Sequence, residues 1–242
     1  MNGVLEKLKD GVLGVIFPMT CVGCGREGRY VCAECEIFFG EAGFVCPFCQ
    51  QASFGGERHS ACAPRYGLDG LVSMWEYEGV VQRLIHLVKY GGVTHAAKEI
   101  TERSFGRMTA EGSRFEAFLS FLHSPVTQVA YVPSHKKKEK RRGFNQAAIF
   151  AETLSRYAGR PCISLLCKTK ETTPQIDLHK EDRLHNVQGS FICLADSWAG
   201  NIEKVVLVDD VWTTGATMKE CCKTLKKAGV REVWGFTVAR TP

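Results

Sequence analysis

One stretch constrains the fold more than any other: residues 205–217 read VVLVDDVWTTGAT. The four apolar residues 205–208 predict a strand that is buried on both faces. Two adjacent carboxylates, Asp209 and Asp210, follow where that strand is expected to end, and a short polar turn comes next. A helix is expected after the turn, with Gly229 as its stop. Its apolar face comprises Met218, Cys221, Cys222, Leu225 and Ala228.

A strand that leads through a loop into a helix N-terminus offers a site for an anion. Free backbone N–H groups and the helix dipole at 215–217 favour a phosphate, and three threonine hydroxyls nearby add donors. Asp209 and Asp210 would repel that phosphate, but they suit the vicinal hydroxyls of a ribose or a divalent metal. A ligand that carries a ribose between phosphates satisfies both halves. The alternative is an ordinary strand–loop–helix corner with a capping threonine.

A second stretch repeats the plan, because the expected strand 129–132 leads through a polar segment into a helix that ends near Tyr157. The segment holds six cations: Lys136, Lys137, Lys138, Lys140, Arg141 and Arg142. A cationic loop beside a helix N-terminus suits a pyrophosphate. Its expected ligands are Ser134, His135, Lys137, Arg141 and Arg142. A nucleic-acid contact and a solvated surface loop remain as alternatives, and the scarcity of aromatic residues in the run weakens base stacking as a binding mode.

The rest of the chain completes an α/β pattern. Further strands are expected over 71–77, 162–167 and 233–238, and helices over 79–90 and 94–123. Strands that alternate with helices predict a parallel sheet with right-handed crossovers, whose ligands collect at the carboxyl ends of the strands. The polar, aperiodic segment 168–190 is expected to form a flexible lid. The residues singled out in it are Gln175, Arg183 and Asn186.

Eight of the possible metal ligands fall into four closely spaced pairs near the N-terminus. The pairs are Cys21 and Cys24, Cys32 and Cys35, Cys46 and Cys49, and His59 and Cys62. A tetrahedral zinc ion needs two such pairs, so the simplest assignment joins neighbouring pairs into two sites. Interleaved pairing remains possible, as does a single loaded site with His59 as a bystander. Disulfides are disfavoured because no export signal precedes them. The remaining five cysteines are expected to be buried as small apolar residues.

Composition fits a globular protein with one sizeable core and a small extra module. The chain has 242 residues, 45% of them hydrophobic and 24% charged, with a net charge of +5. The expected parts are an amphipathic helix over 1–20, a zinc-binding module over 21–65 and the α/β domain over 66–242. The first segment alternates apolar and charged residues and lacks the apolar centre of a signal peptide. No apolar run approaches the length of a membrane span, so a cytoplasmic location is expected.

The 209–217 string resembles the ribose-5-phosphate loop of type I phosphoribosyltransferases, which use phosphoribosyl pyrophosphate (PRPP). The resemblance implies that Asp209 and Asp210 hold the ribose hydroxyls in a catalytic role, and that Mg²⁺ accompanies PRPP. It also implies a cradle for the 5′-phosphate formed by Thr213, Thr214, Gly215, Ala216 and Thr217. In 6-oxopurine salvage enzymes an acid that handles a proton on the base takes the place of Thr213, which weakens that purine-salvage assignment.

The whole chain resembles the ComF family of phosphoribosyltransferase-like proteins, which includes the GntX-type DNA-utilisation proteins. A cysteine-rich head, RGFNQ at 142–146, the 175–187 segment and the 209–217 string recur in one order. The resemblance implies a bacterial, cytoplasmic, competence-associated protein with an N-terminal double zinc ribbon. Two positions depart from the family pattern: His59 replaces a more usual cysteine, and Gly91 stands where many members carry another cation.

Two functional hypotheses follow. In the first, the chain is a phosphoribosyltransferase with an unidentified acceptor, in which Mg²⁺ and the cationic segment stabilise the departing pyrophosphate. In the second, the chain is a non-catalytic module whose PRPP site senses a ligand or is vestigial. The zinc ribbons and residues 136–142 would then contact single-stranded DNA or a helicase-like partner.

Overall fold

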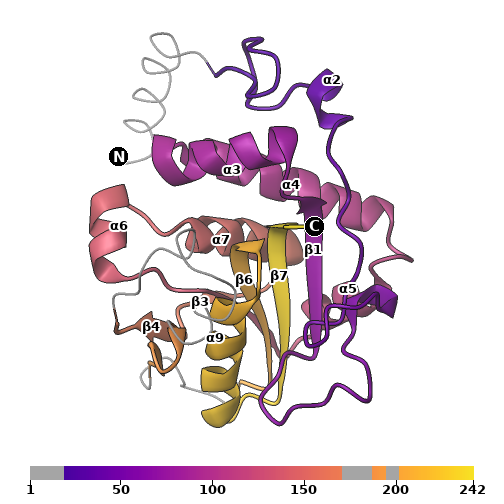
Figure 1. The fold of residues 1–242 in the computed structure, drawn as a ribbon, viewed down its shortest axis with the longest axis vertical. Coiled ribbons are helices and arrows are strands. Elements are labelled where there is room, and N and C mark those ends of the chain that lie inside the picture. The colour runs from indigo at the N-terminus through magenta and orange to yellow at the C-terminus, as the bar shows by residue number, and fades with distance from the viewer. Residues whose placement is uncertain (1–18, 171–186, 195–201) are drawn as a thin grey trace.

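The centre of the molecule is a five-stranded sheet in which every strand pair is parallel (Figure 1). The computed structural model describes residues 19–170, 187–194 and 202–242. The strands lie in the order β1 (Gly70–Glu76), β7 (Glu232–Arg240), β6 (Lys204–Trp212), β2 (Thr127–Tyr131) and β3 (Cys162–Ile163). The expected α/β class with a parallel sheet is confirmed.

Helices cover both faces of this sheet. Successive residues of a strand point to opposite sides, so each buried strand packs against helices on both faces. In β6, Val206 and Val208 pack with one set of helices, and Val205 and Leu207 pack against the other. The first set comprises α3 (Gly79–Gly91), α4 (Thr94–Ala110), α5 (Glu116–His123) and α7 (Gln146–Ala158). The opposite face carries α9 (Ala216–Lys227), which lies in front of the sheet in Figure 1.

The connections of two central strands run in opposite directions. From β2 the chain crosses through α7 to β3, and from β6 it crosses through α9 to β7, on the other side. Because β2 and β6 are neighbours, the segments that follow them lie side by side at the carboxyl edge of the sheet. Such a divergence is where open α/β sheets bind their ligands.

Two local expectations were wrong, and one strand was missed. The cationic segment is not a loop but a short helix, α6 (Lys136–Arg142), because Lys, Arg and Glu are good helix formers and Gly143 ends the helix in the left-handed region. The strand expected over 162–167 is two strands, β3 and β4 (Leu166–Lys168). The second of these pairs antiparallel with β5 (Phe191–Cys193), a strand that the sequence pattern did not predict.

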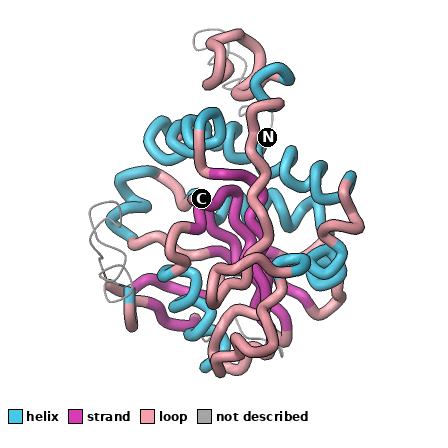
Figure 2. Tube along the Cα trace, turned by 45° about the vertical axis from the view of Figure 1, so that its right-hand side comes forward, coloured by secondary structure: helices cyan, strands magenta, loops and turns pink. Residues whose placement is uncertain are grey.

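The segment 21–65 forms an extended path with one cysteine cluster near each end (Figure 2). Its middle pairs with the free edge of β1, where Ala42 N–H donates to Met74 O and Glu76 N–H donates to Gly40 O. Short helices, α2 (Ala33–Glu36) and η1 (Phe54–Gly56), lie along it. Among the described residues no helix is both long and apolar enough to cross a membrane. Residues 1–18 of the predicted N-terminal helix lie outside the described residues.

Candidate functional site

Asp209 and Asp210 lie where one side of β6 loses its neighbour. The pairing of β2 with β6 ends at Tyr131 and Val208, whereas β7 continues to pair with β6 as far as Trp212. The two acids therefore lie within the strand, not after it, and the β2 side of β6 is uncovered at their level. Both line cavities at the carboxyl edge of the sheet.

Two adjacent cavities meet at these acids. The first, of about 320 Å³, is lined mainly by residues 209–218, and the second, of about 290 Å³, mainly by residues 132–147. The residues common to both are Lys89, Asp209, Asp210 and Thr217. The acids thus stand at the boundary between a cavity at the start of α9 and a cavity beside α6.

The first cavity is built on the segment 212–217, here called the β6 corner. Gly215 precedes α9 with a φ of 72°, and a Cβ at this position would lie 2.2 Å from the ring of Trp212. Only glycine meets both demands without strain. The Thr214 hydroxyl accepts a hydrogen bond from Ala216 N–H at 3.3 Å. Thr213, Gly215, Ala216 and Thr217 line the cavity, and Thr214 supports it from a buried position.

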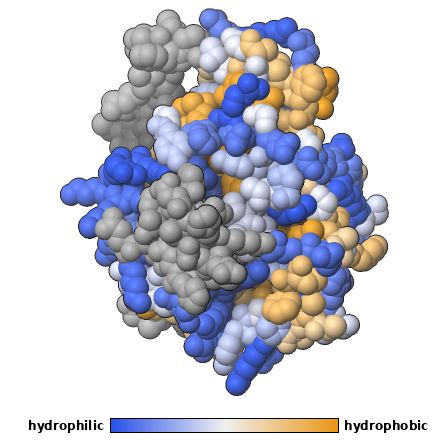
Figure 3. Space-filling model, in the orientation of Figure 1, coloured by the Kyte–Doolittle hydropathy of each residue, from blue (hydrophilic) through white to orange (hydrophobic). Residues whose placement is uncertain are grey.

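The second cavity is built on residues 132–147, here called the β2 corner. One face of α6 turns His135, Lys138, Arg141 and Arg142 toward the cavity, at a spacing of three to four residues. Ser134 and Lys138 line the cavity, whereas Lys137, which the sequence predicts as a ligand, is not among its lining residues. Figure 3 shows the hydrophilic surface at the left edge, where Figure 1 places α6. The residues predicted for the lid, Gln175, Arg183 and Asn186, lie outside the described residues.

A lysine from a distant helix completes the site. Lys89, in the last turn of α3, places Nζ 2.9 Å from Asp210 Oδ2. Burial opposes its charge, but Asp210 outweighs burial and raises the pKa of Lys89. The sequence pattern alone does not mark Lys89 as a site residue. The available signal was its position just before the Gly91-Gly92 helix stop.

The two acids have unlike surroundings. Burial, together with the neighbouring Asp210 charge, raises the pKa of Asp209 to about 7. Asp209 Oδ1 accepts a hydrogen bond from Asp210 N–H at 2.8 Å, which opposes the rise only in part. Near neutral pH the pair therefore carries less than two full negative charges. Such a pair accepts hydroxyl donors with less mutual repulsion than two exposed carboxylates would have.

The cysteine pairs assemble as neighbours. Cys21, Cys24, Cys32 and Cys35 form one group, and Cys46, Cys49, His59 and Cys62 form the other, with all ligand atoms of a group within 4.8 Å of one another. Cys32 Sγ lies 3.7 Å from the sulfurs of Cys21 and Cys24. Tetrahedral zinc with Zn–S bonds of about 2.3 Å separates its ligands by about 3.8 Å, so the geometry fits zinc.

The geometry of His59 suits a metal ligand. Its Nδ1 lies 3.4 Å from Cys49 Sγ, and its Nε2 lies 3.1 Å from the carbonyl oxygen of Ala52. A ligating histidine commonly donates its other ring N–H to such an oxygen, which leaves the first nitrogen free to bind metal. Burial opposes ionisation of Cys46, but backbone hydrogen bonds around it outweigh burial and lower its pKa to about 7. A thiolate is the form that a metal requires.

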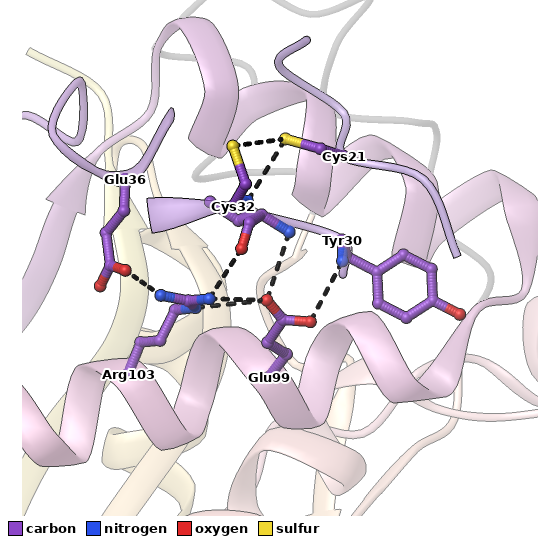
Figure 4. Close-up of polar contacts among 7 residues, drawn as sticks. Cys21, Tyr30, Cys32, Glu36, Glu99 and Arg103 are labelled. Carbon is purple, nitrogen blue, oxygen red and sulfur yellow. Dashed lines mark hydrogen bonds and ion pairs between the residues drawn. The ribbon is translucent and has the colours of Figure 1, made fainter. Parts of the chain in front are cut away.

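The first cluster is clamped to α4 by two charged side chains (Figure 4). Glu99 accepts hydrogen bonds from the N–H groups of Tyr30 and Val31, both at 3.2 Å. Arg103 donates to Val31 O at 2.7 Å and also pairs with Glu36 and Glu99. The second cluster is held near the start of β1, where Arg58 N–H donates to Asp69 O and Lys226 pairs with the Asp69 carboxylate at 2.7 Å.

Comparison with known proteins finds relatives along most of the chain, although no family model matches. Competence protein F of Haemophilus influenzae is 38% identical over 111 residues, which cover 45% of this chain and 48% of that protein. Competence protein ComFC of Streptococcus pneumoniae is 27% identical over 92% of this chain and its own full length. The DNA utilization protein YhgH of Escherichia coli K12 is 24% identical over 92% of this chain and 89% of its own.

The fold defines the class of protein: an α/β protein with a parallel sheet and two cysteine clusters whose geometry suits zinc. Along most of its length the chain resembles the ComF family. A solved structure, TT1426 from Thermus thermophilus, matches 52% of this chain and 81% of its own with 15% identity, but its TM-score of 0.27 is too low to establish a common fold.

Proposed function

We propose that the chain binds PRPP together with Mg²⁺ and acts as a phosphoribosyltransferase whose acceptor is unidentified. One observation carries the proposal: the paired acids lie at the boundary between a cavity at a helix N-terminus and a cavity lined by cations. PRPP has the same order of groups, with a 5′-phosphate, a ribose and a pyrophosphate.

In this proposal each part of PRPP meets a matching group. The 5′-phosphate lies at the β6 corner, on the amides and hydroxyls of 213–217. Asp209 and Asp210 accept hydrogen bonds from the ribose hydroxyls. The pyrophosphate lies at the β2 corner, against His135, Arg141 and Arg142, and Ser134 or Lys138 can add donors. Lys89 then gives up part of its contact with Asp210 and reaches the anion instead, since it lines both cavities.

The reaction is a substitution at the anomeric carbon. The bond from that carbon to pyrophosphate breaks, its electron pair leaves with pyrophosphate, and the acceptor forms the new bond and releases a proton. Bound Mg²⁺ supplies charge neutralisation on the leaving group. The residues of the chain position the sugar and stabilise the charges, and catalysis rests on that preorganisation. We extend the role suggested by the relatives' names, competence and DNA utilisation, to this chain as part of the same proposal.

Binding is tested by the thermal unfolding of the protein with PRPP and Mg²⁺. The wild type is expected to gain several degrees at saturating ligand, because a ligand that binds only the native state stabilises it. The Asp209→Asn, Asp210→Asn double variant should gain nothing, while Glu203→Gln, at a partly exposed ion pair elsewhere, should behave as the wild type. An unchanged gain in the double variant would contradict the ribose assignment. Pyrophosphate release across a panel of bases and amines would then separate turnover from ligand sensing.

A second function is favoured by the outer face of α6. Lys136 and Lys140 are exposed and do not line the cavity, so they are placed to contact the phosphates of single-stranded DNA or an acidic partner. Such a contact requires no catalysis, and it is compatible with PRPP binding in the cavities. Replacing both lysines by glutamine should weaken oligonucleotide binding and flatten its salt dependence, without changing the PRPP-induced thermal shift. A binding constant that does not respond to salt would exclude these phosphate contacts.

We also propose that each cysteine cluster holds one structural zinc ion. The support is the close approach of four ligand atoms in each cluster and the second hydrogen bond of His59. Metal analysis of the purified chain should give two zinc ions, and Cys24→Ser and His59→Ala should each remove one. A single zinc that persists in His59→Ala but is lost in Cys24→Ser would restrict the metal to the first cluster.

A further inference from the structure

A third cavity opens directly beside the β2 corner. It has a volume of about 320 Å³ and is lined by Lys89, Tyr90, Gly91, Gly92, Arg141 and Arg142. Four of these residues, Lys89, Tyr90, Arg141 and Arg142, also line the second cavity, so the two spaces are continuous. We call this third space the Tyr90 pocket. It lies between the end of α3 and the end of α6, on segments about fifty residues apart in the sequence.

Tyr90 offers an aromatic surface at this place. The residue is 60% exposed, although it stands in the last turn of a helix whose other apolar residues are mostly buried. Gly92 ends that helix in the left-handed region, so no further turn covers the ring. The Arg142 guanidinium carbon lies 5.5 Å from the centre of the ring, and the His86 ring lies 5.2 Å away with a tilt of 50°. Both contacts leave more than half of the Tyr90 surface exposed.

The two arginines of the pocket, Arg141 and Arg142, bring positive charge to it. Within the part of the chain that the structure describes, neither Arg141 nor Arg142 lies within ion-pair distance of a carboxylate. By contrast, Arg103, Arg107 and Arg114 each pair with two glutamates. Guanidinium groups that lie beside a cavity and have no carboxylate within ion-pair distance are suited to hold a phosphate through two parallel N–H donors.

The aromatic ring and the two arginines together indicate which class of ligand the pocket can bind. A bare polyphosphate would use the arginines and leave the ring idle, and a purely aromatic ligand would leave the arginines without a partner. A nucleotide uses both, since every base has a flat face that stacks on tyrosine or on a guanidinium plane. We propose that the Tyr90 pocket binds a nucleotide, with its base stacked on Tyr90 and its phosphate held by Arg141 and Arg142.

This site also revises an expectation drawn from the sequence. The run 136–142 has few aromatic neighbours along the chain, which argued against base stacking. In the folded protein the aromatic residue comes from α3 and meets the last residue of α6. The nucleotide site does not depend on PRPP binding. It shares Arg141 and Arg142 with the proposed pyrophosphate site, however, so excess pyrophosphate should displace a nucleotide.

The test uses the full chain and measures binding of dAMP, of a twelve-residue oligo-dT strand and of inorganic pyrophosphate by calorimetry. Tyr90→Ala should weaken whichever base-bearing ligand is bound by roughly fivefold to a hundredfold, in line with the loss of one stacked base. Tyr90→Phe should keep the wild-type affinity, and pyrophosphate should bind Tyr90→Ala as it binds the wild type. Tyr157→Ala is the matched control. Tyr157 is also a partly exposed tyrosine on a helix, but it stacks on Phe105 and does not line the Tyr90 pocket.

The pattern of results identifies the source of the nucleotide. A Tyr90-dependent loss with dAMP assigns the pocket to free nucleotides, and a loss confined to oligo-dT assigns it to one unit of a strand. The proposal is overturned if neither ligand binds the wild type at millimolar concentration, or if Tyr90→Ala binds both as the wild type does. It is also overturned if Tyr157→Ala causes the same loss, or if pyrophosphate affinity falls with Tyr90→Ala as far as nucleotide affinity. The Asp209→Asn, Asp210→Asn variant should still bind the nucleotide, which separates this result from the fate of the PRPP proposal.

Discussion

The β6 corner and the β2 corner both join a buried strand to a helix at the same edge of the sheet, but they present different groups to a ligand. At the β6 corner the groups are backbone amides and threonine hydroxyls, fixed by a glycine that fits against Trp212. At the β2 corner they are the ends of long cationic side chains on one face of a short helix. The positions of the donors are therefore fixed by the main chain at the β6 corner, and they depend on side-chain conformation at the β2 corner.

Because of this difference, the two corners are expected to bind phosphate groups in different ways. A site made of backbone donors loses little entropy on binding and depends weakly on salt, but it tolerates almost no change of shape. A site made of lysine and arginine attracts anions over a longer range, accepts several poses, and weakens as salt rises. We expect the β6 corner to determine where PRPP lies and the β2 corner to determine how fast and how strongly anions arrive.

We expect the greatest change in stability from replacing glycine by alanine, and the cost should differ between the two corners. Gly215→Ala should destabilise the protein by about 3–5 kcal/mol and abolish PRPP binding, because the new Cβ combines a positive φ with a collision against the Trp212 ring. Gly143→Ala at the end of α6 also has a positive φ, 83°, but a Cβ there meets nothing within 4 Å. Its cost should be about 1 kcal/mol. Urea unfolding of both variants measures the difference, and equal costs would show that the Trp212 contact does not constrain the corner.

The next effect concerns salt. Arg141→Gln with Arg142→Gln should reduce pyrophosphate affinity by about tenfold to a hundredfold at low salt, and should reduce the slope of log affinity against log salt by about 1 to 2. Thr217→Val at the β6 corner should weaken PRPP by a smaller factor and leave the slope unchanged, because it removes a neutral hydroxyl. Titrations at several salt concentrations measure both. A slope that falls equally in the two variants would remove the distinction between the corners.

A smaller effect is expected from Asp209, one of the two acids that line both cavities. Burial holds the pKa of Asp209 at about 7, above its ordinary value of 3.8, so the folded state keeps a proton that the unfolded chain has already released. Stability from this source is complete below pH 4 and is lost as the pH rises through 7. Asp209→Asn avoids that loss, and it should raise the melting temperature by a few degrees at pH 8 with little change at pH 4. A melting temperature that falls at pH 8 would show that the charged side chain stabilises the empty site.

The two corners also differ in how far the sequence predicted them. The β6 corner could be predicted nearly whole, because its strand, turn and helix are consecutive and its donors belong to the backbone. The β2 corner was predicted in composition but not in geometry, because only the helical twist of α6 decides that Lys138 faces the cavity. Lys89 and Tyr90 could not be placed there from the pattern, since the packing of α3 across the edge brings them in. The local spacing of the cysteines predicted their pairing, but not that the chain between the clusters would run along β1.

In the proposed complex a ribose lies on Asp209 and Asp210, with a phosphate group at each corner. A crystal structure of the protein with PRPP and Mg²⁺ would show this arrangement. We expect both ribose hydroxyls within hydrogen-bond distance of the two carboxylates, the 5′-phosphate on the amides of 215–217, and the pyrophosphate against Arg141 and Arg142. A sugar that lies away from both acids, or a pyrophosphate seated at the start of α9, would contradict this expectation.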